Sequence, residues 1–366
     1  MRGHKLGWLK LLGAAIASLM LIVACQQSQV SPPNPVDTIA PPPSSTRITL
    51  NGTGASFPLF LYERIFSEYR QTVDPNLLVN YQPTGSAAGI QQVLSQTVDF
   101  GASDIAMSDD EMTEVEPGIL LIPMTAGTVA IAYNLPDIES GLKLSRTTLA
   151  DIFLGKLTQW NDPAIAEANP ERSLPDLPII LVHRSDGSGT TATLTAHLSA
   201  ISPDWQTQVG TGLNVEWPAG VGIKSNTGVS AQIQQAEGAI GYVEYSYAKK
   251  LGLPIAALEN QAGQFVEPNP ANGLKGLETV TMPANLKVFV TDPAGADAYP
   301  IVTYSWILAY QQYEDAAKGE ALKAVLKWGL LEGQQFSETL GYVPLPVNVV
   351  EQAVTAIEQI QMDSEA

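Results

Sequence analysis

Serine, threonine and glycine residues precede three predicted helices, and each of these loops follows a short strand-like segment. The three strand–loop–helix units are predicted at residues 47–50, 51–56 and 57–71, at 77–81, 82–85 and 86–96, and at 179–182, 184–187 and 188–199. A helix N-terminus offers unpaired N–H donors and the positive end of a dipole, which can bind an oxyanion. One such loop alone is better explained by helix capping. Three loops, one of them carrying Arg184, favour an anion site.

The charge of the chain narrows the kinds of partner. It has 19 basic and 37 acidic residues, a net charge of −18. Nucleic-acid binding depends on basic patches that neutralise phosphates, so we expect no nucleic-acid partner. Acidic proteins do not attract anions over long distances either, so an anion site here must depend on local dipoles and a few charges.

The N-terminus has the pattern of an export signal. Arg2, Lys5 and Lys10 precede an apolar stretch at 11–24, which is shorter than a membrane span and ends in small residues. The sequence IVAC then ends at Cys25, the only cysteine of the chain, which excludes an intrachain disulfide. We expect a signal peptide at 1–24 and lipidation of Cys25. The alternative is an uncleaved hydrophobic anchor with an incidental thiol. Cleavage would move the net charge to about −21, because three basic residues are lost.

Residues 25–46 are rich in proline and predict an extended tether between a membrane and a folded body. The remaining 320 residues or so have enough apolar content for two domains. Their alternating strand-like and helix-like segments predict an α/β fold. A further amphipathic helix is predicted at 350–361.

Enzyme signatures are missing from the sequence. None of the three loop serines stands in the G-x-S-x-G pattern of hydrolases, and no G-x-x-x-x-G-K-[ST] nucleotide loop occurs. His183 and His197, the histidines outside the signal, are not spaced as a helical metal pair. We therefore expect a binding protein, with no catalytic residue, metal or cofactor. A phosphatase evolved on a binding fold is the remaining enzymatic alternative.

Several segments resemble, in order, the phosphate-binding proteins of the bacterial Pst transport system. They are GTGASFP at 52–58, TVDFGASD at 97–104, DIFLGK at 151–156 with WND at 160–162, RSDGSGT at 184–190 and GAIGYVEY at 238–245. The resemblance implies a type II periplasmic-binding-protein fold, in which two α/β lobes joined by a two-strand hinge close over a ligand. It places lobe 1 at 47–124 plus 301–366 and lobe 2 at 125–300.

The resemblance also implies the ligand contacts. Hydroxyl, backbone or charged contacts to phosphate fall on Ser56, Phe57, Ser86, Asp104, Arg184, Ser188, Gly189 and Thr190. Asp186 corresponds to a residue that holds the arginine in place. Arg184 can donate two parallel charge-assisted bonds. Asp104 would accept a proton that phosphate retains at neutral pH and sulfate lacks, so it would penalise the unprotonated dianion.

The implied function is capture of inorganic phosphate for the permease subunits of an ABC importer. We expect a monomer in the periplasm or cell envelope, held to a membrane by its lipid anchor. Arsenate is protonated and shaped like phosphate, so the sequence leaves it open as a ligand. A surface adhesin or sensor that has lost transport is also left open.

Overall fold

The computed structural model describes residues 47–362, which belong to one compact unit. The predicted signal peptide, Cys25 and tether lie outside the described residues. Within 47–362, no helix combines the length and the apolar character needed to cross a membrane.

Eight strands form one mixed sheet in the order β2-β1-β3-β11-β4-β8-β6-β7. Their bounds are β1 (Ile48–Gly54), β2 (Leu77–Gln82), β3 (Phe100–Ser103), β4 (Ile119–Tyr133), β6 (Ile180–Arg184), β7 (Val221–Ile223), β8 (Ala239–Glu244) and β11 (Val302–Tyr310). The two long strands β4 and β11 pair antiparallel at its centre, with a register shift between Ser305 and Trp306. Parallel strands lie on either side of this pair, β1–β3 on one and β6–β8 on the other.

Five further strands form two small sheets. β5 (Leu142–Leu144), β9 (Ala256–Glu259) and β10 (Phe265–Val266) make one of them. β12 (Gln312–Tyr313) and β13 (Gln361–Met362) pair in parallel and bring the C-terminal segment beside the end of β11.

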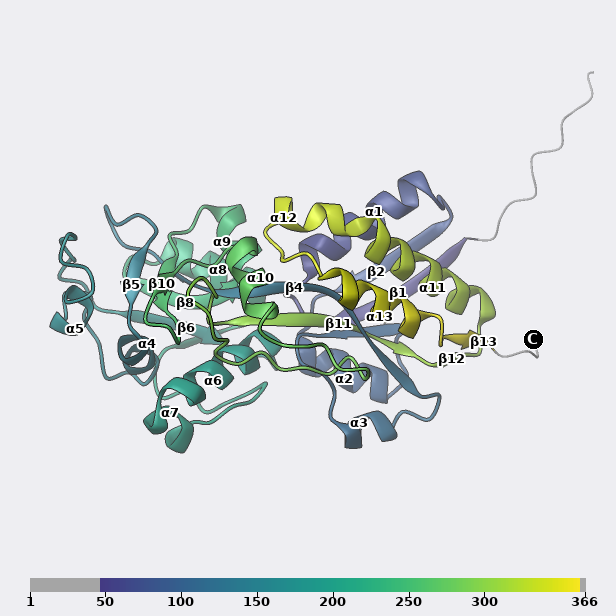
Figure 1. Cartoon of the computed structure of the whole chain (residues 1–366), viewed down its shortest axis with the longest axis horizontal. Helices are drawn as coiled ribbons and strands as arrows, with labels where there is room; N and C mark the ends of the chain where they lie inside the picture. Colours follow the sequence, from purple (N-terminus) through teal and green to yellow (C-terminus); the bar gives the residue numbers. More distant parts are fainter. Residues whose placement is uncertain (1–46, 363–366) are drawn as a thin grey trace, which may run out of the picture. The chain divides into compact units, whose positions relative to one another are not determined.

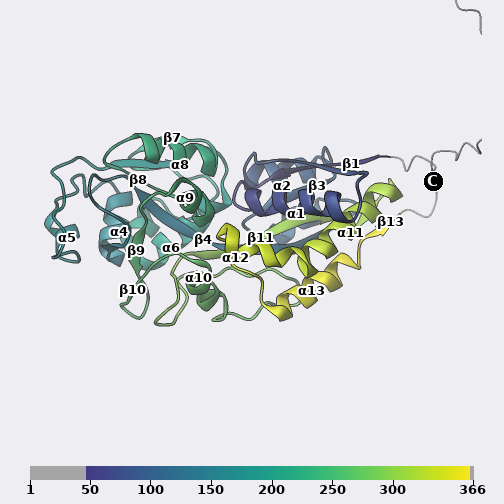
Figure 2. The same cartoon turned by 90° about the horizontal axis from the view of Figure 1, so that it is seen from above.

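Helices pack on both groups of parallel strands (Figures 1 and 2). Beside β1–β3 lie α1 (Leu59–Thr72), α2 (Ser86–Leu94) and α11 (Ala316–Leu331), with α13 (Val347–Ile357) against α11 and β4. Near β6 and β8 lie α6 (Gly189–Ile201), α8 (Ser225–Gln235) and α9 (Tyr245–Leu251). The others are α3 (Asp109–Thr113), α4 (Arg146–Phe153), α5 (Pro163–Ala166), α7 (Pro203–Gln208), α10 (Pro270–Leu277), α12 (Ser337–Leu340) and the 3₁₀ turn Gly333–Phe336.

The α/β class predicted from the alternating segments is confirmed. A continuous apolar core runs along the sheet, and Trp160, Trp205 and Trp306 are fully buried in it. The helix predicted at 350–361 is present as Val347–Ile357. The helix begins directly after Pro346, its N-cap residue, because proline is tolerated at a helix start but not in the helix interior.

Two predicted loop boundaries are wrong. Residues 51–54 were expected in a loop, but they extend β1, which pairs with β2 and β3 on its two sides. Gly52 permits this pairing, because a Cβ there would lie 2.1 Å from the Phe100 ring. Arg184 was expected in a loop and is instead the last residue of β6. Tertiary pairing has overridden the turn preference of these glycine- and polar-rich segments.

Candidate functional site

The N-termini of α2 and α6 meet directly. Ser86 is the first residue of α2, and its Oγ accepts a hydrogen bond from the backbone N of Gly189 at 3.1 Å. Ser188 caps α6, its Oγ accepting from the N of Thr191 at 3.2 Å. The backbone N of Ala87 also donates to the carbonyl of Gly187 at 3.1 Å. Two of the three predicted anion loops therefore lie side by side, although about 100 residues separate them.

The first predicted loop joins them through Ser56. Ser56 is buried, and both its Oγ and the Thr190 Oγ1 accept hydrogen bonds from the Asn226 side chain, at 3.0 and 3.3 Å. Phe57 follows it, fully buried, just before Pro58 at the N-cap of α1. The Ser56 and Phe57 carbonyls accept from the hydroxyls of tyrosines 247 and 342, at 2.5 and 2.8 Å. The backbone of this loop is thus fixed from several elements at once.

Asp104 follows β3 and is 2 % exposed. Its Oδ1 accepts from Ser305 Oγ at 2.8 Å, and its backbone N donates to Ser86 Oγ at 3.2 Å. Burial raises the pKa of Asp104 from 3.8 to about 7, against the hydrogen bond of Ser305, the charge of Arg184 and the hydrogen bond of Ser86, which all lower it. The carboxyl group can therefore exchange a proton near neutral pH.

Gly189 brings Asp104 against the start of α6. A Cβ at position 189 would lie 2.6 Å from the Cβ of Asp104 and 2.7 Å from the Oγ of Ser86. Any larger residue would push these groups apart. The glycine predicted for its backbone amide is therefore also needed for the close approach of the carboxylate.

Arg184 lies at the carboxyl end of β6 and is 3 % exposed. Its Nε and Nη2 donate to the two carboxylate oxygens of Asp186 at 2.7 and 2.5 Å. Its Nη1 is buried and has no hydrogen-bond partner among the described residues. Burial alone would raise the pKa of Asp186, but the hydrogen bonds and charge of Arg184 hold it below its usual range. An unpaired donor on a buried cation is costly, so this nitrogen is suited to an anionic ligand.

The structure thus places the predicted residues in one buried cluster. Hydrogen bonds or close approaches connect Ser86, Asp104 and Gly189 directly, and Asn226 connects Ser56 with Thr190. Ser188 precedes Gly189 in the chain and caps the same helix. Arg184 joins them through its electrostatic effect on Asp104. Hydroxyl groups, helix N-termini, one cation and one carboxyl group of raised pKa can together bind an oxyanion that carries a proton.

Sequence reasoning missed three residues that support this cluster. Asn226 and Ser305 contact the Ser56 and Asp104 side chains, and the Tyr242 hydroxyl accepts from the backbone N of Arg184 at 3.0 Å. Asn226 could have been found from the sequence, because α8 also begins with a polar sequence, SNTG, like the helices that follow the three predicted loops. Ser305 stands alone as a serine in the apolar strand VTYSWILAY, which is a weaker signal.

A second carboxyl group is buried nearby. Glu244 is fully buried at the end of β8, and burial raises its pKa well above the usual value. Its Oε2 accepts from the backbone N of Ser246 at 2.9 Å and from the hydroxyl of the same residue. Its Oε1 has no hydrogen-bond partner among the described residues.

No group of three or more His, Cys, Asp or Glu suited to a metal occurs within residues 47–362.

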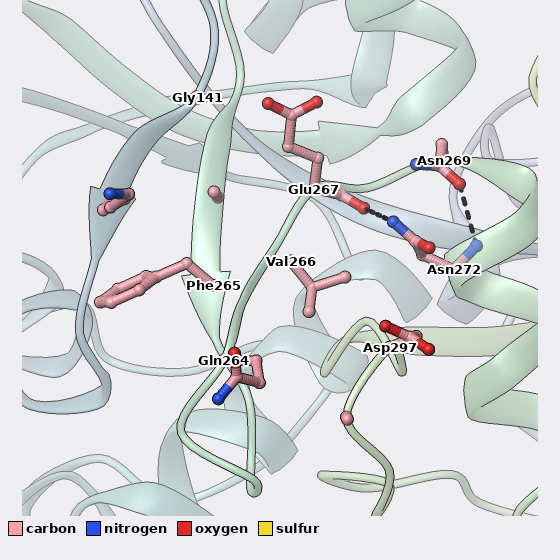
Figure 3. A pocket seen from close by; sticks show the side chains of 11 residues that line it. Gly141, Gln264, Phe265, Val266, Glu267, Asn269, Asn272 and Asp297 are labelled. Carbon is pink, nitrogen blue, oxygen red and sulfur yellow. Dashed lines mark hydrogen bonds between the residues drawn. The ribbon is translucent and has the colours of Figure 1, made fainter.

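A surface pocket lies elsewhere on the protein (Figure 3). Its volume is about 550 Å³, and Lys143, Phe265, Glu267 and Asp297 are among the residues that line it. The Asn269 side chain in it caps α10, its Oδ1 accepting from the backbone N of Asn272 at 2.9 Å, and the Asn272 side chain donates to the Glu267 carbonyl at 3.0 Å. None of the predicted ligand residues lines this pocket.

Known proteins resemble the chain over most of its length. The sequence model described as the PBP superfamily domain matches residues 40–331. The phosphate-binding protein PstS of Xylella fastidiosa (strain 9a5c) is 41 % identical over 318 residues, covering 85 % of this chain and 86 % of the relative. PstS of Haemophilus influenzae is 40 % identical over 316 residues, with 86 % and 93 % covered.

Solved structures agree in fold. A high-affinity periplasmic phosphate-binding protein bound with phosphate superimposes with a TM-score of 0.68 at 19 % identity, covering 84 % of this chain and 93 % of that one. At this low sequence identity the structural likeness supports the fold alone, which is a mixed α/β periplasmic-binding-protein fold. The sequence matches show that the chain belongs to the PstS family of phosphate-binding proteins, within the PBP superfamily, and the fold agrees with them.

Proposed function

We propose that the protein captures inorganic phosphate outside the cytoplasm and delivers it to an ABC importer. The observation that carries this proposal is the burial of Arg184 and Asp104 together at converging helix N-termini, with the arginine Nη1 left unpaired. The names of the relatives support it, since they are phosphate-binding proteins at about 40 % identity.

The ligand contacts in this proposal are the eight residues named from the sequence. Ser56, Ser86 and Thr190 supply hydroxyl groups, and Phe57 supplies a backbone donor at a helix start. Ser188 and Gly189 stand at the α6 N-terminus, where the Ser188 N donates to the Leu213 carbonyl at 2.9 Å and the Gly189 N to Ser86 Oγ at 3.1 Å, so the Gly189 N–H has to turn from Ser86 to the ligand on binding. Arg184 donates from Nη1, while Asp186 fixes the plane of its guanidinium through two bonds. Asp104 accepts the proton of the ligand, which a sulfate ion does not have.

Closure of two lobes is the proposed binding motion, with lobe 1 at 47–124 plus 301–366 and lobe 2 at 125–300. The division is supported by the sheet, because both boundaries fall at the central strands, within β4 and directly before β11. Each lobe would supply part of the site, as the bond between Gly189 and Ser86 illustrates. Hinge closure of this kind is a general property of periplasmic binding proteins, and ligand shifts the population toward the closed state.

Attachment to a membrane is the remaining part of the proposal. The IVAC sequence supports lipidation of Cys25, and the proline-rich residues 25–46 would hold the compact body away from the bilayer. Capture would then take place in the periplasm or cell envelope, next to the permease.

Calorimetric titration of residues 45–366, freed of bound ligand, tests the proposal at neutral pH. We expect one-to-one binding of phosphate and no binding of sulfate. An arsenate titration establishes whether the site separates two protonated anions of the same shape. Absence of phosphate binding by folded, ligand-free protein at several temperatures would contradict the proposal. Binding of sulfate as tight as that of phosphate would contradict only the proposed role of Asp104.

A further inference from the structure

Asn226 connects two of the proposed ligand residues that come from different parts of the chain. It is the second residue of α8 and is fully buried. Its Nδ2 donates to Ser56 Oγ at 3.0 Å and to Thr190 Oγ1 at 3.3 Å. Its backbone N also donates to Ser56 Oγ, at 3.3 Å. Ser56 precedes Asn226 by 170 residues, so these bonds join the α1 and α8 N-terminal regions.

The orientation of the Asn226 amide group is fixed by its fourth bond. Its Oδ1 accepts from the backbone N of Glu244 at 3.1 Å. A backbone N–H can only donate, so the oxygen of the amide must face Glu244. The NH₂ group is therefore turned toward the two hydroxyls, and it has one proton for each of them.

This arrangement determines what the hydroxyls can do. A hydroxyl group has one proton to donate and two lone pairs that accept. Ser56 Oγ accepts two bonds from Asn226, so both lone pairs are occupied and only its proton remains available. Thr190 Oγ1 accepts one bond from the same residue. Ser56 is thus restricted to donating, whereas Thr190 keeps one lone pair and is only biased toward donating.

We propose that Asn226 is a positioning residue that turns the Ser56 and Thr190 hydroxyls into donors for the anion. The inference rests on the proposed function, and deepens it by adding a specificity element. If Asp104 accepts the one ligand proton, every other contact must donate. A hydroxyl free to rotate would spend part of its time with its lone pairs toward the anion. Asn226 removes this alternative before the ligand arrives.

The chain contains a matched control residue. Asn169 is also fully buried, its Oδ1 accepts from the backbone N of Lys143 at 2.9 Å, and its Nδ2 donates to the Lys143 and Ile165 carbonyls, both at 2.8 Å. It has the same bonding pattern as Asn226, but its acceptors are carbonyls that have no proton to direct. Substitutions at position 169 thus reproduce the loss of a buried amide without the proposed effect on ligand binding.

The test compares Asn226→Ala and Asn226→Asp with Asn169→Ala and Asn169→Asp by calorimetric titration of inorganic phosphate. We expect phosphate affinity to fall about tenfold in Asn226→Ala and about a hundredfold in Asn226→Asp. The larger loss follows because a carboxylate of the same shape accepts from both hydroxyls, and turns their protons away from the ligand. Its charge also repels the anion. The Asn169 variants should keep the wild-type affinity within about twofold, while they lower the thermal midpoint.

A double-mutant cycle with Ser56→Ala separates positioning from mere packing. Once the hydroxyl is absent, Asn226→Ala should cost at most about threefold in affinity, because part of its effect acts through Ser56. Additive losses would overturn the inference, as would wild-type affinity in Asn226→Asp. If Asn226→Asp does not fold, Asn226→Ala and the cycle decide the question. Failure of the wild-type protein to bind phosphate would instead overturn the proposed function.

Discussion

Two arginines of the protein each hold a carboxylate with two parallel hydrogen bonds. The guanidinium nitrogen that takes no part in these bonds differs between the two. Arg184 uses Nε and Nη2 for Asp186, which leaves the buried Nη1 without a partner. Arg146, the first residue of α4, uses Nη1 and Nη2 for Asp292 at 2.8 and 2.7 Å. The Arg184 side chain is 1 % exposed and that of Arg146 is 26 % exposed.

The difference distinguishes an arginine–carboxylate pair that keeps a donor for a ligand from a pair whose role is structural. Both terminal nitrogens of Arg146 donate to Asp292, and these bonds hold the long segment 278–301 against α4. Arg184 is held along one edge, so its orientation is fixed while a terminal donor is kept for another partner. A bidentate arginine–carboxylate pair is therefore not in itself a sign of a structural role. What matters is which edge of the guanidinium is used and whether the remaining nitrogen is buried.

The two regions should respond to pH in opposite directions, and the larger effect is expected at Asp104. The unfolded chain releases this proton near pH 3.8, whereas ligand-free folded protein keeps it to about pH 7. The stability that the protonated group provides is thus full below pH 3.8 and lost as pH rises to about 7. The loss is at most about 4 kcal/mol. Asp104→Asn, which does not titrate, should gain stability relative to wild type by this amount over the same window.

Urea unfolding in phosphate-free buffer between about pH 4 and pH 8 measures the Asp104 effect. Other titrating groups are common to both proteins and cancel in the difference. Two unfolding free-energy curves that stay parallel across the window would show that Asp104 ionises as easily in the folded protein as in the unfolded chain.

At the Arg146 pair the expected pH effect is reversed and smaller. His197 on α6 is buried 3.6 Å from Asp292, and neither ring nitrogen has a hydrogen-bond partner among the described residues. Burial lowers the pKa of His197 from 6.5 to about 4, and the Asp292 charge does not offset it. Its neutral form supports the fold above pH 6.5, and this support is lost as pH falls toward 4, by about 3 kcal/mol.

His197→Leu removes the titrating ring at this position. The difference in unfolding free energy between wild type and this variant should be constant above about pH 7. It should then shift in favour of the variant as pH falls to about 4. A difference that is independent of pH would mean that protonated His197 is stabilised by Asp292 after all.

The sequence supported the local parts of the site better than its long-range contacts. Each anion loop is contiguous in the chain, so its hydroxyls and helix start could be predicted from residue type and order. The contacts of Asn226 with Ser56 and of Ser305 with Asp104 span 170 and 201 residues. Residue spacing carries no information on such distances. They depend on the strand order of the sheet, in which β11 lies between β3 and β4.

The extension of β1 to Gly54 was missed for a related reason. Glycine weakens isolated strands, so the glycine-rich sequence that begins at Asn51 predicts a loop. The sheet contains it because β1 is paired on both sides and because Gly54 adopts φ +141°, a conformation unfavourable for other residues. Local preference and tertiary pairing disagree here, and pairing prevails.

Replacing each arginine in turn tests the comparison itself. Arg184→Ala should weaken phosphate binding by about tenfold or more, because a charge-assisted donor is lost and Asp186 remains without its partner. Arg146→Ala should leave phosphate affinity within about twofold, and lower the unfolding free energy by about 2 kcal/mol, less than for a fully buried pair. Calorimetry and urea unfolding on both variants give the four values. Unchanged affinity in Arg184→Ala would remove this residue from the site, and the unpaired Nη1 would then have to be explained by packing. Weakened binding in Arg146→Ala would show that the segment 278–301 supports the site from a distance, so that the two pairs differ in degree and not in kind.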